Sequence, residues 1–363
     1  LSAPATEQTR EAYMAALFAE IGGRAKDYSD RTVTSIFIGG GTPSLLSGEQ
    51  IGQLMDRIRE QFAMAQDAEI TMEVNPGTAN AEKLRNFYTA GINRLSIGMQ
   101  SAQAEELKNL GRIHDFEGFC QVYREAVEAG FTNINVDIMS GLPGQTLASY
   151  RDTLEKVLHL EPMPQHISAY SLIVEEGTPF AAMAERGELP LPEEETERAM
   201  YEETIEVLSK YGFHRYEISN YARDGYECRH NVGYWIRRDY LGFGIGAASL
   251  IDNVRFQNEK SLGAYLAHPL ESREEEQTLT VQDRMEETMF LGLRLTRGVS
   301  CVDFAEQYGR TVEEVYGEVI ARNVADGLLT VTERKENQKK DRFLALTKRG
   351  LDLSNYVMAQ FLF

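Results

Sequence analysis

The sequence of 363 residues has three cysteines, one tryptophan and a shortage of positive charge. Its cysteines, Cys120, Cys228 and Cys301, stand far apart, so they indicate neither a disulfide framework nor a metal site of closely spaced thiolates. Such cysteine use is typical of a reducing cytoplasm. Lysine and arginine number 37 against 56 acidic residues, a formal net charge of −19, which opposes binding to nucleic acid or anionic membranes.

Long apolar runs are missing too. No stretch approaches the roughly 18 apolar residues of a membrane-spanning helix, and residues 1–7 have neither the basic region nor the apolar core of a signal peptide. With 42% hydrophobic residues the chain can instead bury a substantial core. We expect a large domain over residues 1–270 and a small one over residues 279–363, with a charged linker at residues 271–278.

The most informative stretch, residues 35–47, leads from a short apolar run into three glycines, Gly39–Gly41, and then Pro43. Because glycine has no Cβ, its backbone can lie very close to a ligand. The stretch is neither a phosphate-binding P-loop nor a G-x-G-x-x-G motif. From these residues alone, a ligand-binding loop and a plain turn between a strand and a helix both remain open.

Strand and helix patterns alternate over the first two thirds of the chain. The strands are expected at residues 33–38, 69–74, 94–99, 133–139, 166–173 and 215–219, with helices at 6–26, 47–62, 81–90, 147–160 and 193–210. This alternation predicts βα units and a parallel sheet. Polar residues Glu73, Gln100 and Asp137 end three strands. Sites form at such ends in both α/β barrels and open sheets, so the pattern does not separate these two architectures.

The last part of the chain predicts a separate small module. Helices are expected at residues 283–294, 301–307, 311–326 and 348–361, and a hairpin at 328–346 with a charged tip at 335–340. Helices followed by a two-stranded wing are typical of a winged-helix-like domain. Because the module's charge is mixed and the whole chain is acidic, we favour a structural or lid role over DNA binding.

Several motifs, in matching order and spacing, resemble the oxygen-independent coproporphyrinogen III oxidase group of radical S-adenosylmethionine (SAM) proteins. They are Gly39–Pro43, Glu73–Pro76, Arg94–Gln100, Gly111–His114 and Asp137–Pro143. Within that group, the His-Asn-x-x-Tyr-Trp run at residues 230–235 resembles the HemW-type heme chaperones and is not expected in the decarboxylating oxidase. The resemblance covers essentially the whole chain.

The resemblance implies an α/β fold, a partial (β/α)6 TIM-like barrel of radical SAM type plus a small α+β winged-helix-like C-terminal domain. It also implies SAM, a [4Fe-4S] cluster, heme and a cytoplasmic location. The SAM contacts it implies are Gly40, Gly41, Thr42, Glu73, Gln100, Arg112 and Asp137, with Ile173 and Ala248 at the adenine. Each of these residues also has a non-functional alternative. Glu73 could be a solvated charge at a strand end, Arg112 part of a surface ion pair and Asp137 a buried structural carboxylate. Ile173 and Ala248 could belong to the hydrophobic core.

One departure from this family is large. The Cys-x3-Cys-x2-Cys motif that holds its cluster is absent, and Leu1–Ala3 resembles the residues just after the third cysteine. We therefore expect the first strand and the cluster loop upstream of Leu1; a relative that has lost its cluster is the alternative. The three cysteines present cannot substitute, because a cluster needs several thiolates that converge on one site.

His230 is the best candidate heme contact, since imidazole can ligate heme iron, although a hydrogen-bonded structural histidine is the alternative. Tyr234 and Trp235 can stack on a porphyrin or close a core. Cys228 is a weaker candidate, because an isolated cysteine is usually inert. The favoured function is a chaperone that binds heme and transfers it to an acceptor protein. Radical decarboxylation of coproporphyrinogen III and a cluster-less binding protein are the alternatives.

Overall fold

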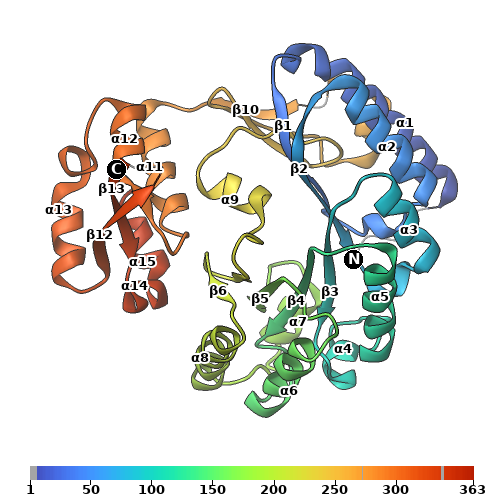
Figure 1. Ribbon diagram of the computed structural model, residues 1–363, viewed down its shortest axis with the longest axis horizontal. Coiled ribbons are helices and arrows are strands. Elements are labelled where there is room, and N and C mark those ends of the chain that lie inside the picture. The colour runs from blue at the N-terminus through green and yellow to red at the C-terminus, as the bar shows by residue number, and fades with distance from the viewer. Residues whose placement is uncertain (1–5, 272, 337–338) are drawn as a thin grey trace. The chain divides into compact units, whose positions relative to one another are not determined.

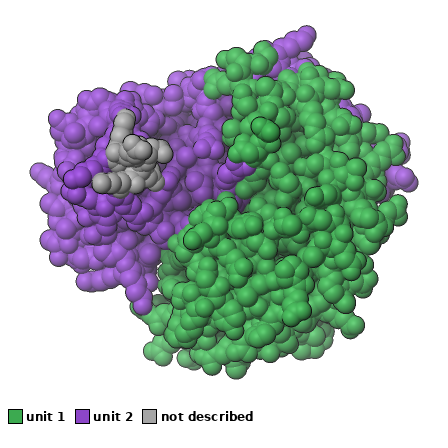
Figure 2. Space-filling view, in the orientation of Figure 1, with its two compact units in different colours: residues 1–4, 29–215, 219–227 green, residues 5–28, 216–218, 228–363 purple. Residues whose placement is uncertain are grey.

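The computed structural model describes residues 6–271, 273–336 and 339–363, which fall into two compact units (Figure 1, Figure 2). The described part of the first unit covers residues 29–215 and 219–227. The second unit covers residues 6–28, 216–218 and the described residues of 228–363. Each unit has its own sheets and helices. None of the helices in the described part of the chain is long and apolar enough to cross a membrane.

A curled seven-stranded sheet forms the first unit, in the order β1-β2-β3-β4-β5-β7-β6. Its parallel strands are β1 (Thr32–Ile38), β2 (Ala63–Val74), β3 (Arg94–Gln100), β4 (Ile134–Ser140) and β5 (His166–Ser171). The parallel-rich half-barrel predicted from the sequence is confirmed. The single strand predicted at 215–219 is wrong: β6 (His214–Arg215) turns back into β7 (Asn220–Ala222), and this hairpin return makes β7 antiparallel to β5.

The parallel strands have one apolar and one polar face. Side chains such as Met72, Ile97 and Val136 are fully buried on one face, which the helices cover. The helices of this unit are α2 (Gly48–Gln61), α3 (Ala81–Thr89), α4 (Ala104–Asn109), α5 (Phe116–Ala129), α6 (Leu147–Leu158) and α8 (Glu194–Lys210), together with α7 (Pro179–Glu185), which has no buried residue. In Figure 1, α2, α3 and α5 lie along the outer side of the sheet. The opposite, inner face carries the polar residues of the site described below.

A buried carboxylate, Glu20, places the first helix in the second unit. Helix α1 (Glu7–Arg24) brings Glu20 against the glycine-rich segment 241–247 and against β9 (Val254–Asn258). The Glu20 carboxylate accepts hydrogen bonds from Gly244 N at 2.8 Å, Asn258 Nδ2 at 2.7 Å and Tyr265 Oη at 2.7 Å. Because all of these partners are distant in sequence, the local pattern that predicts α1 does not reveal where it packs.

A three-stranded antiparallel sheet lies beside this helix in the second unit. It consists of β8 (Ala248–Ile251), β9 and β10 (Arg273–Thr278). In the chain, helix α10 (Leu262–Ala267) lies between β9 and β10. Residues 273–278 of the expected linker therefore form a strand. Their charged, exposed side chains suggest a linker, but the backbone of β10 pairs with β9. Helix α9 (Arg229–Trp235) also belongs to this unit.

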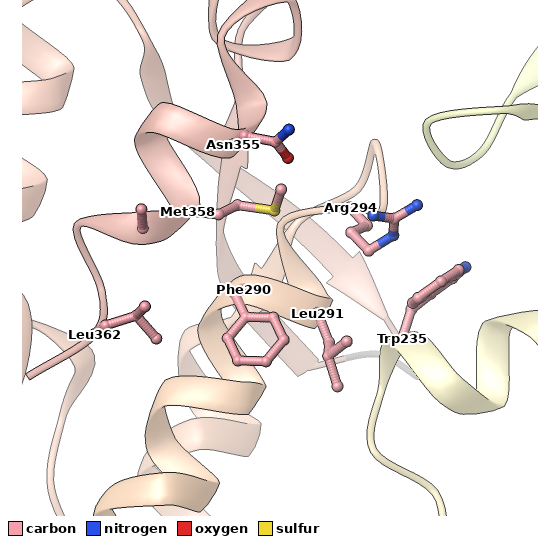
Figure 3. Close-up of a pocket in the computed structure, with 8 residues that line it drawn as sticks. Trp235, Phe290, Leu291, Arg294, Asn355, Met358 and Leu362 are labelled. Atoms are coloured by element: carbon pink, nitrogen blue, oxygen red, sulfur yellow. The ribbon is translucent and has the colours of Figure 1, made fainter. Parts of the chain in front are cut away.

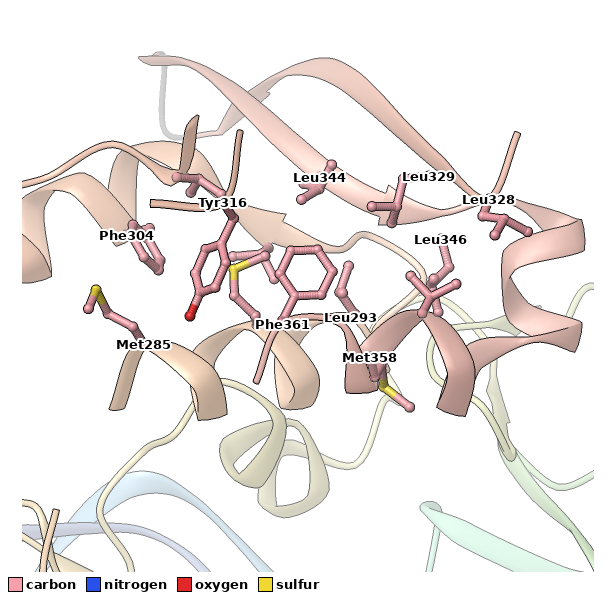
Figure 4. Close-up of a cluster of buried hydrophobic side chains, with 14 residues drawn as sticks. Met285, Leu293, Phe304, Tyr316, Leu328, Leu329, Leu344, Leu346, Met358 and Phe361 are labelled. Carbon is pink, nitrogen blue, oxygen red and sulfur yellow. The ribbon is translucent and has the colours of Figure 1, made fainter. Parts of the chain in front are cut away.

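The small α+β module predicted at the C-terminus is confirmed. It contains helices α11 (Val281–Gly292), α12 (Cys301–Tyr308) and α13 (Val312–Ala325), and a sheet of β11 (Val299–Ser300), β13 (Lys339–Leu346) and β12 (Leu329–Glu336). Figure 4 shows its core, in which Phe304, Tyr316, Leu344 and Phe361 are buried. The predicted last helix is broken into α14 (Lys348–Asp352) and α15 (Ser354–Ala359). Of the predicted charged tip, residues 337–338 lie outside the described residues.

Candidate functional site

The glycine loop follows β1 and meets a carboxylate from the next strand. Gly40 has φ of +84°, and its N–H donates to Glu73 Oε2 at 3.2 Å. A Cβ on Gly39 would lie 2.8 Å from Glu73 Cδ, so only glycine allows this approach. A Cβ on Gly40 or Gly41 would have nothing within 4 Å. The loop thus offers backbone with open space on one side and a carboxylate close to the other.

Polar contacts fix this loop to the turn after β2. Ser44 is fully buried, and its Oγ accepts from Asn75 N at 3.0 Å and lies 2.6 Å from Thr78 Oγ1. The Lys83 ammonium donates to the carbonyl oxygens of Ser44 at 2.8 Å and Thr78 at 3.1 Å. These contacts between protein groups hold the two loops together, so the ligand-facing backbone is preorganised.

A hydrogen-bonded network on the inner face of the sheet supports Asp137. Ser96 Oγ donates to Asp137 Oδ2 at 3.2 Å, and Asn135 Nδ2 donates to Asp137 Oδ1 at 2.6 Å. Asn135 Oδ1 lies 2.6 Å from His166 Nδ1 and accepts from Ser168 Oγ at 3.1 Å. Because this oxygen can only accept, His166 carries its proton on Nδ1. Burial, followed by Arg94 and His214, lowers the pKa of His166 well below its usual value, so the ring is neutral.

Glu73 and Arg112 both interact electrostatically with the Asp137 of this network. Burial and then the Asp137 charge raise the pKa of Glu73, against the opposing Gly40 N–H. Burial also raises the pKa of Asp137, although its hydrogen bonds from Asn135 and Ser96 oppose the rise. Arg112 is half-buried; burial lowers its pKa and Asp137 opposes this. Since the Arg112 side chain makes no hydrogen bond to any other described residue, its guanidinium can still bind a carboxylate.

The backbone is irregular at Gln100, the last residue of β3, and this irregularity sets the direction of its side chain. The register between β3 and β4 shifts between Gly98 and Gln100, and Gln100 has φ of +69°. Its Nε2 lies over Gly98, where a Cβ would be only 2.8 Å away. Bulges at strand ends often re-aim side chains at functional sites, and a non-glycine residue in this conformation carries strain.

The remaining predicted SAM contacts are placed less tightly. Thr42 precedes the short 3-10 helix Pro43–Leu45 but makes no side-chain capping bond. Ile173 follows β5 with 78% of its surface exposed, and Ala248 begins β8 in the second unit with an exposed side chain. The structure therefore brings Gly40, Glu73 and Asp137 together in one network of interactions. The adenine contacts of Ile173 and Ala248 stay predictions.

The aromatic motif lies on α9. His230 Nε2 is 3.0 Å from Tyr234 Oη, and the two rings meet edge to face with centroids 4.9 Å apart. Tyr234 also meets Tyr240 edge to face at 4.7 Å. Cys228 is completely buried just before the helix. His230 of this motif is thus already in contact with an aromatic side chain, that of Tyr234.

The described residues fit SAM but not an iron–sulfur cluster. The amine, carboxylate and hydroxyls of SAM match a site with open backbone, two carboxylates and an available guanidinium. Cys120 lies on α5, Cys228 precedes α9 and Cys301 begins α12. Among the residues the structure describes, no three His, Cys, Asp or Glu side chains are grouped to hold a metal ion.

Comparison with known proteins identifies the family. The radical SAM superfamily matches residues 4–157, and the HemN C-terminal domain matches residues 279–353. The heme chaperone HemW of Bacillus subtilis (strain 168) is 37% identical over 362 residues, 98% of this chain and 92% of the relative. This chain belongs to the HemW family. HemW of Escherichia coli (strain K12) is 37% identical over 308 residues, 83% of this chain and 78% of its own.

A solved structure of a radical SAM enzyme agrees with the fold of this chain. Coproporphyrinogen III oxidase (HemN) from Escherichia coli, a radical SAM enzyme, superposes with a TM-score of 0.82 at 26% identity. The match covers 98% of this chain and 84% of HemN. The resemblance carried by the sequence motifs is therefore confirmed, as is the fold that it implies.

The motifs did not identify two residues of the inner network, Asn135 and His166. Asn135 is the second residue of β4 and His166 the first of β5, so both lie toward the amino ends of their strands, whereas the motifs mark residues toward the carboxyl ends. The signal that could have found them is alternation: in β4, buried apolar residues alternate with Asn135 and Asp137. A parallel strand covered by helices on both faces would be apolar at nearly every position.

Proposed function

We propose that this protein is a heme chaperone of radical SAM type, which binds heme and SAM and transfers heme to an acceptor protein. The supporting observation is the 37% identity to the heme chaperone HemW of Bacillus subtilis over 98% of this chain. The His230–Trp235 motif, the feature that separates this reading from the decarboxylating oxidase, is present on α9. The three isolated cysteines are consistent with the reducing cytoplasm, which we retain as part of the proposal.

In this proposal the inner face of the half-barrel holds SAM. Gly40, Gly41 and Thr42 offer backbone to its methionyl end, and Glu73 accepts from the ammonium group. Arg112 binds the carboxylate as a bidentate partner. Gln100 and Asp137 bind the ribose hydroxyls, while Ile173 and Ala248 contact the adenine. When bound, SAM supplies a sulfonium-activated adenosyl group; the chain's own residues bind and orient it.

His230 is the proposed heme contact. Its Nε2 lies 3.0 Å from the Tyr234 hydroxyl, so ligation through this atom would displace the hydroxyl. A neutral imidazole is the form that ligates iron. Exchange of this hydrogen bond for an iron bond suits a site that must both take up and release heme.

Two assays on the full-length, anaerobically reconstituted protein test the proposal. Addition of hemin should produce a shifted Soret band, and addition of coproporphyrinogen III should yield no protoporphyrinogen IX. The similarity to HemN makes decarboxylation the second candidate. Turnover to protoporphyrinogen IX would contradict a function restricted to heme transfer, and an unchanged Soret spectrum would contradict heme binding.

A further inference from the structure

A pocket of about 320 Å³ lies in the second unit, between α9, α11 and the C-terminal segment (Figure 3). Its lining is mainly apolar and includes Trp235, Phe290, Leu291, Arg294, Met358 and Leu362. The volume lies at the lower end of the range for small-molecule sites, about 300–1,000 Å³. Two aromatic rings and a thioether at one cavity suit a flat, apolar ligand.

Arg294 supplies the charge at this pocket. Its guanidinium carbon lies 4.3 Å from the centre of the Trp235 ring, in a cation–π contact. Its side chain is 29% exposed, and its ion pair with Glu217 is long, at 3.8 Å. Arg294 Nε and Trp235 Nε1 are buried without a hydrogen-bond partner among the described residues. Such groups are rare in folded proteins.

We propose that this pocket takes one edge of a heme macrocycle, with a heme propionate paired to Arg294. The inference rests on the heme-binding function proposed above. A planar guanidinium held against an aromatic ring matches a carboxylate in two-pronged geometry. Because the cavity is small, much of the macrocycle stays outside it. Partial burial leaves the heme accessible to the protein that receives it.

The pocket and His230 can be tested separately. His230 and Trp235 belong to the same helix, α9, but His230 contacts Tyr234 and is not among the residues that line the pocket. A change confined to the pocket therefore leaves the proposed iron contact in place. Trp235 is also the only tryptophan in the chain, so its fluorescence reports on this pocket directly.

The first experiment tests the charge at the pocket. Hemin and hemin dimethyl ester, which lacks free carboxylates, are titrated into the full-length protein and followed at the Soret band. The wild type should bind hemin about tenfold more tightly than the ester, a difference of about 1.4 kcal/mol. Arg294→Gln should abolish this preference. Arg310→Gln, which removes an exposed arginine outside the pocket lining, should keep it.

The second experiment fills the pocket. Ala359 lines it but has an exposed side chain, so Ala359→Phe adds volume without crowding the core. It should weaken the binding of both probes at least tenfold, whereas Ala321→Phe, exposed on α13, should bind as the wild type does. Circular dichroism checks the fold of each variant; if Ala359→Phe does not fold, Arg294→Gln decides.

The outcomes separate this inference from the proposed function. If the wild type binds hemin and both Arg294→Gln and Ala359→Phe bind it equally well, the pocket is not the heme site, while the chaperone function stands. If Ala321→Phe weakens binding as much as Ala359→Phe does, the pocket assignment is also overturned. If the wild type binds no hemin, both proposals fail.

Discussion

Asn135 Oδ1 and His166 Nδ1 lie 2.6 Å apart, both buried on the inner face of the sheet. Asn135 Nδ2 also donates to Asp137, the carboxylate proposed to bind ribose. The uncharged Asn135 side chain therefore links the neutral His166 to this carboxylate. The amide is well suited to this place, because it accepts on one side and donates on the other.

Asn135→Ala should weaken both the fold and SAM binding. The substitution removes the Asn135 acceptor from the His166 N–H and a donor from Asp137, and loss of a partner by a buried polar group costs about 1–3 kcal/mol. Urea denaturation should therefore show a lower free energy of unfolding, and calorimetry should show weaker SAM binding. Gln121→Ala, exposed on α5, is the control and should change neither. Equal SAM affinity in Asn135→Ala and wild type would contradict a role for the network in the site.

His166 should make stability depend on pH. Its pKa is lowered in the folded state, so the unfolded chain binds the proton more readily. Stability is therefore highest above the unfolded pKa of about 6.5 and falls below it, by up to about 1.4 kcal/mol per pH unit for this one group. Urea denaturation between pH 7.5 and pH 5 measures this slope.

His166→Gln is the matched variant for this measurement. Its amide N–H can replace the imidazole as donor to Asn135 but does not titrate. The slope in the variant should be smaller than in the wild type, and the difference isolates His166 from Glu73 and Asp137, whose raised pKa values act in the opposite direction. Identical slopes in the two proteins would show that His166 is not buried in its neutral form.

Local patterns predict much of this fold and part of its site. The capping box of α2, in which Ser47 and Gln50 exchange both hydrogen bonds, depends on residues three apart and is readable from the sequence. The strand ends at Glu73 and Asp137 follow likewise from alternating elements. The charge of Asp137 on β4 raises the pKa of Glu73 on β2, so the two carboxylates lie close to each other although β3 separates their strands.

Other features depend on distant partners and escape such patterns. The sequence of β10 is rich in charged residues, which predicts a linker, and all of its side chains are exposed. Only its pairing with β9 makes it a strand. The turn back into β7 depends on its pairing with β5, not on its own three residues. Asn135 and His166 lie toward the amino ends of β4 and β5, and only the pairing of these two strands brings them side by side.

The buried carboxylate of Glu20 should be essential to the stability of the second unit. Glu20→Ala leaves Tyr265, Asn258 and the Gly244 N–H without their shared acceptor and removes one partner of Arg24, 3.2 Å away. Loss of one partner of a buried ion pair costs about 3–5 kcal/mol. Thermal unfolding should therefore begin at a much lower temperature in Glu20→Ala. Glu11→Ala, exposed on the same helix, should unfold as the wild type does; equal stability of the two variants would contradict this role.

Gly39 and Gly41 should respond differently to alanine. A Cβ on Gly39 would lie 2.7 Å from Phe37 Cε1 and 2.8 Å from Glu73 Cδ, so Gly39→Ala should cost about 1–3 kcal/mol of stability and displace Glu73. A Cβ on Gly41 would meet nothing within 4 Å, so Gly41→Ala should leave stability within about 0.5 kcal/mol of wild type.

SAM should nevertheless bind Gly41→Ala at least tenfold more weakly, about 1.4 kcal/mol, because the added methyl group enters the space proposed for the methionyl end. Gly52→Ala, in α2 and equally free of neighbours, provides the control: it should retain SAM binding and gain up to about 1 kcal/mol of stability, as expected for glycine replaced by alanine within a helix. Calorimetry with SAM and urea denaturation measure both quantities on the same samples. Undiminished SAM affinity in Gly41→Ala would show that the open side of the glycine loop is not where SAM lies, whereas a loss confined to Gly39→Ala would assign the loop a purely structural role in holding Glu73.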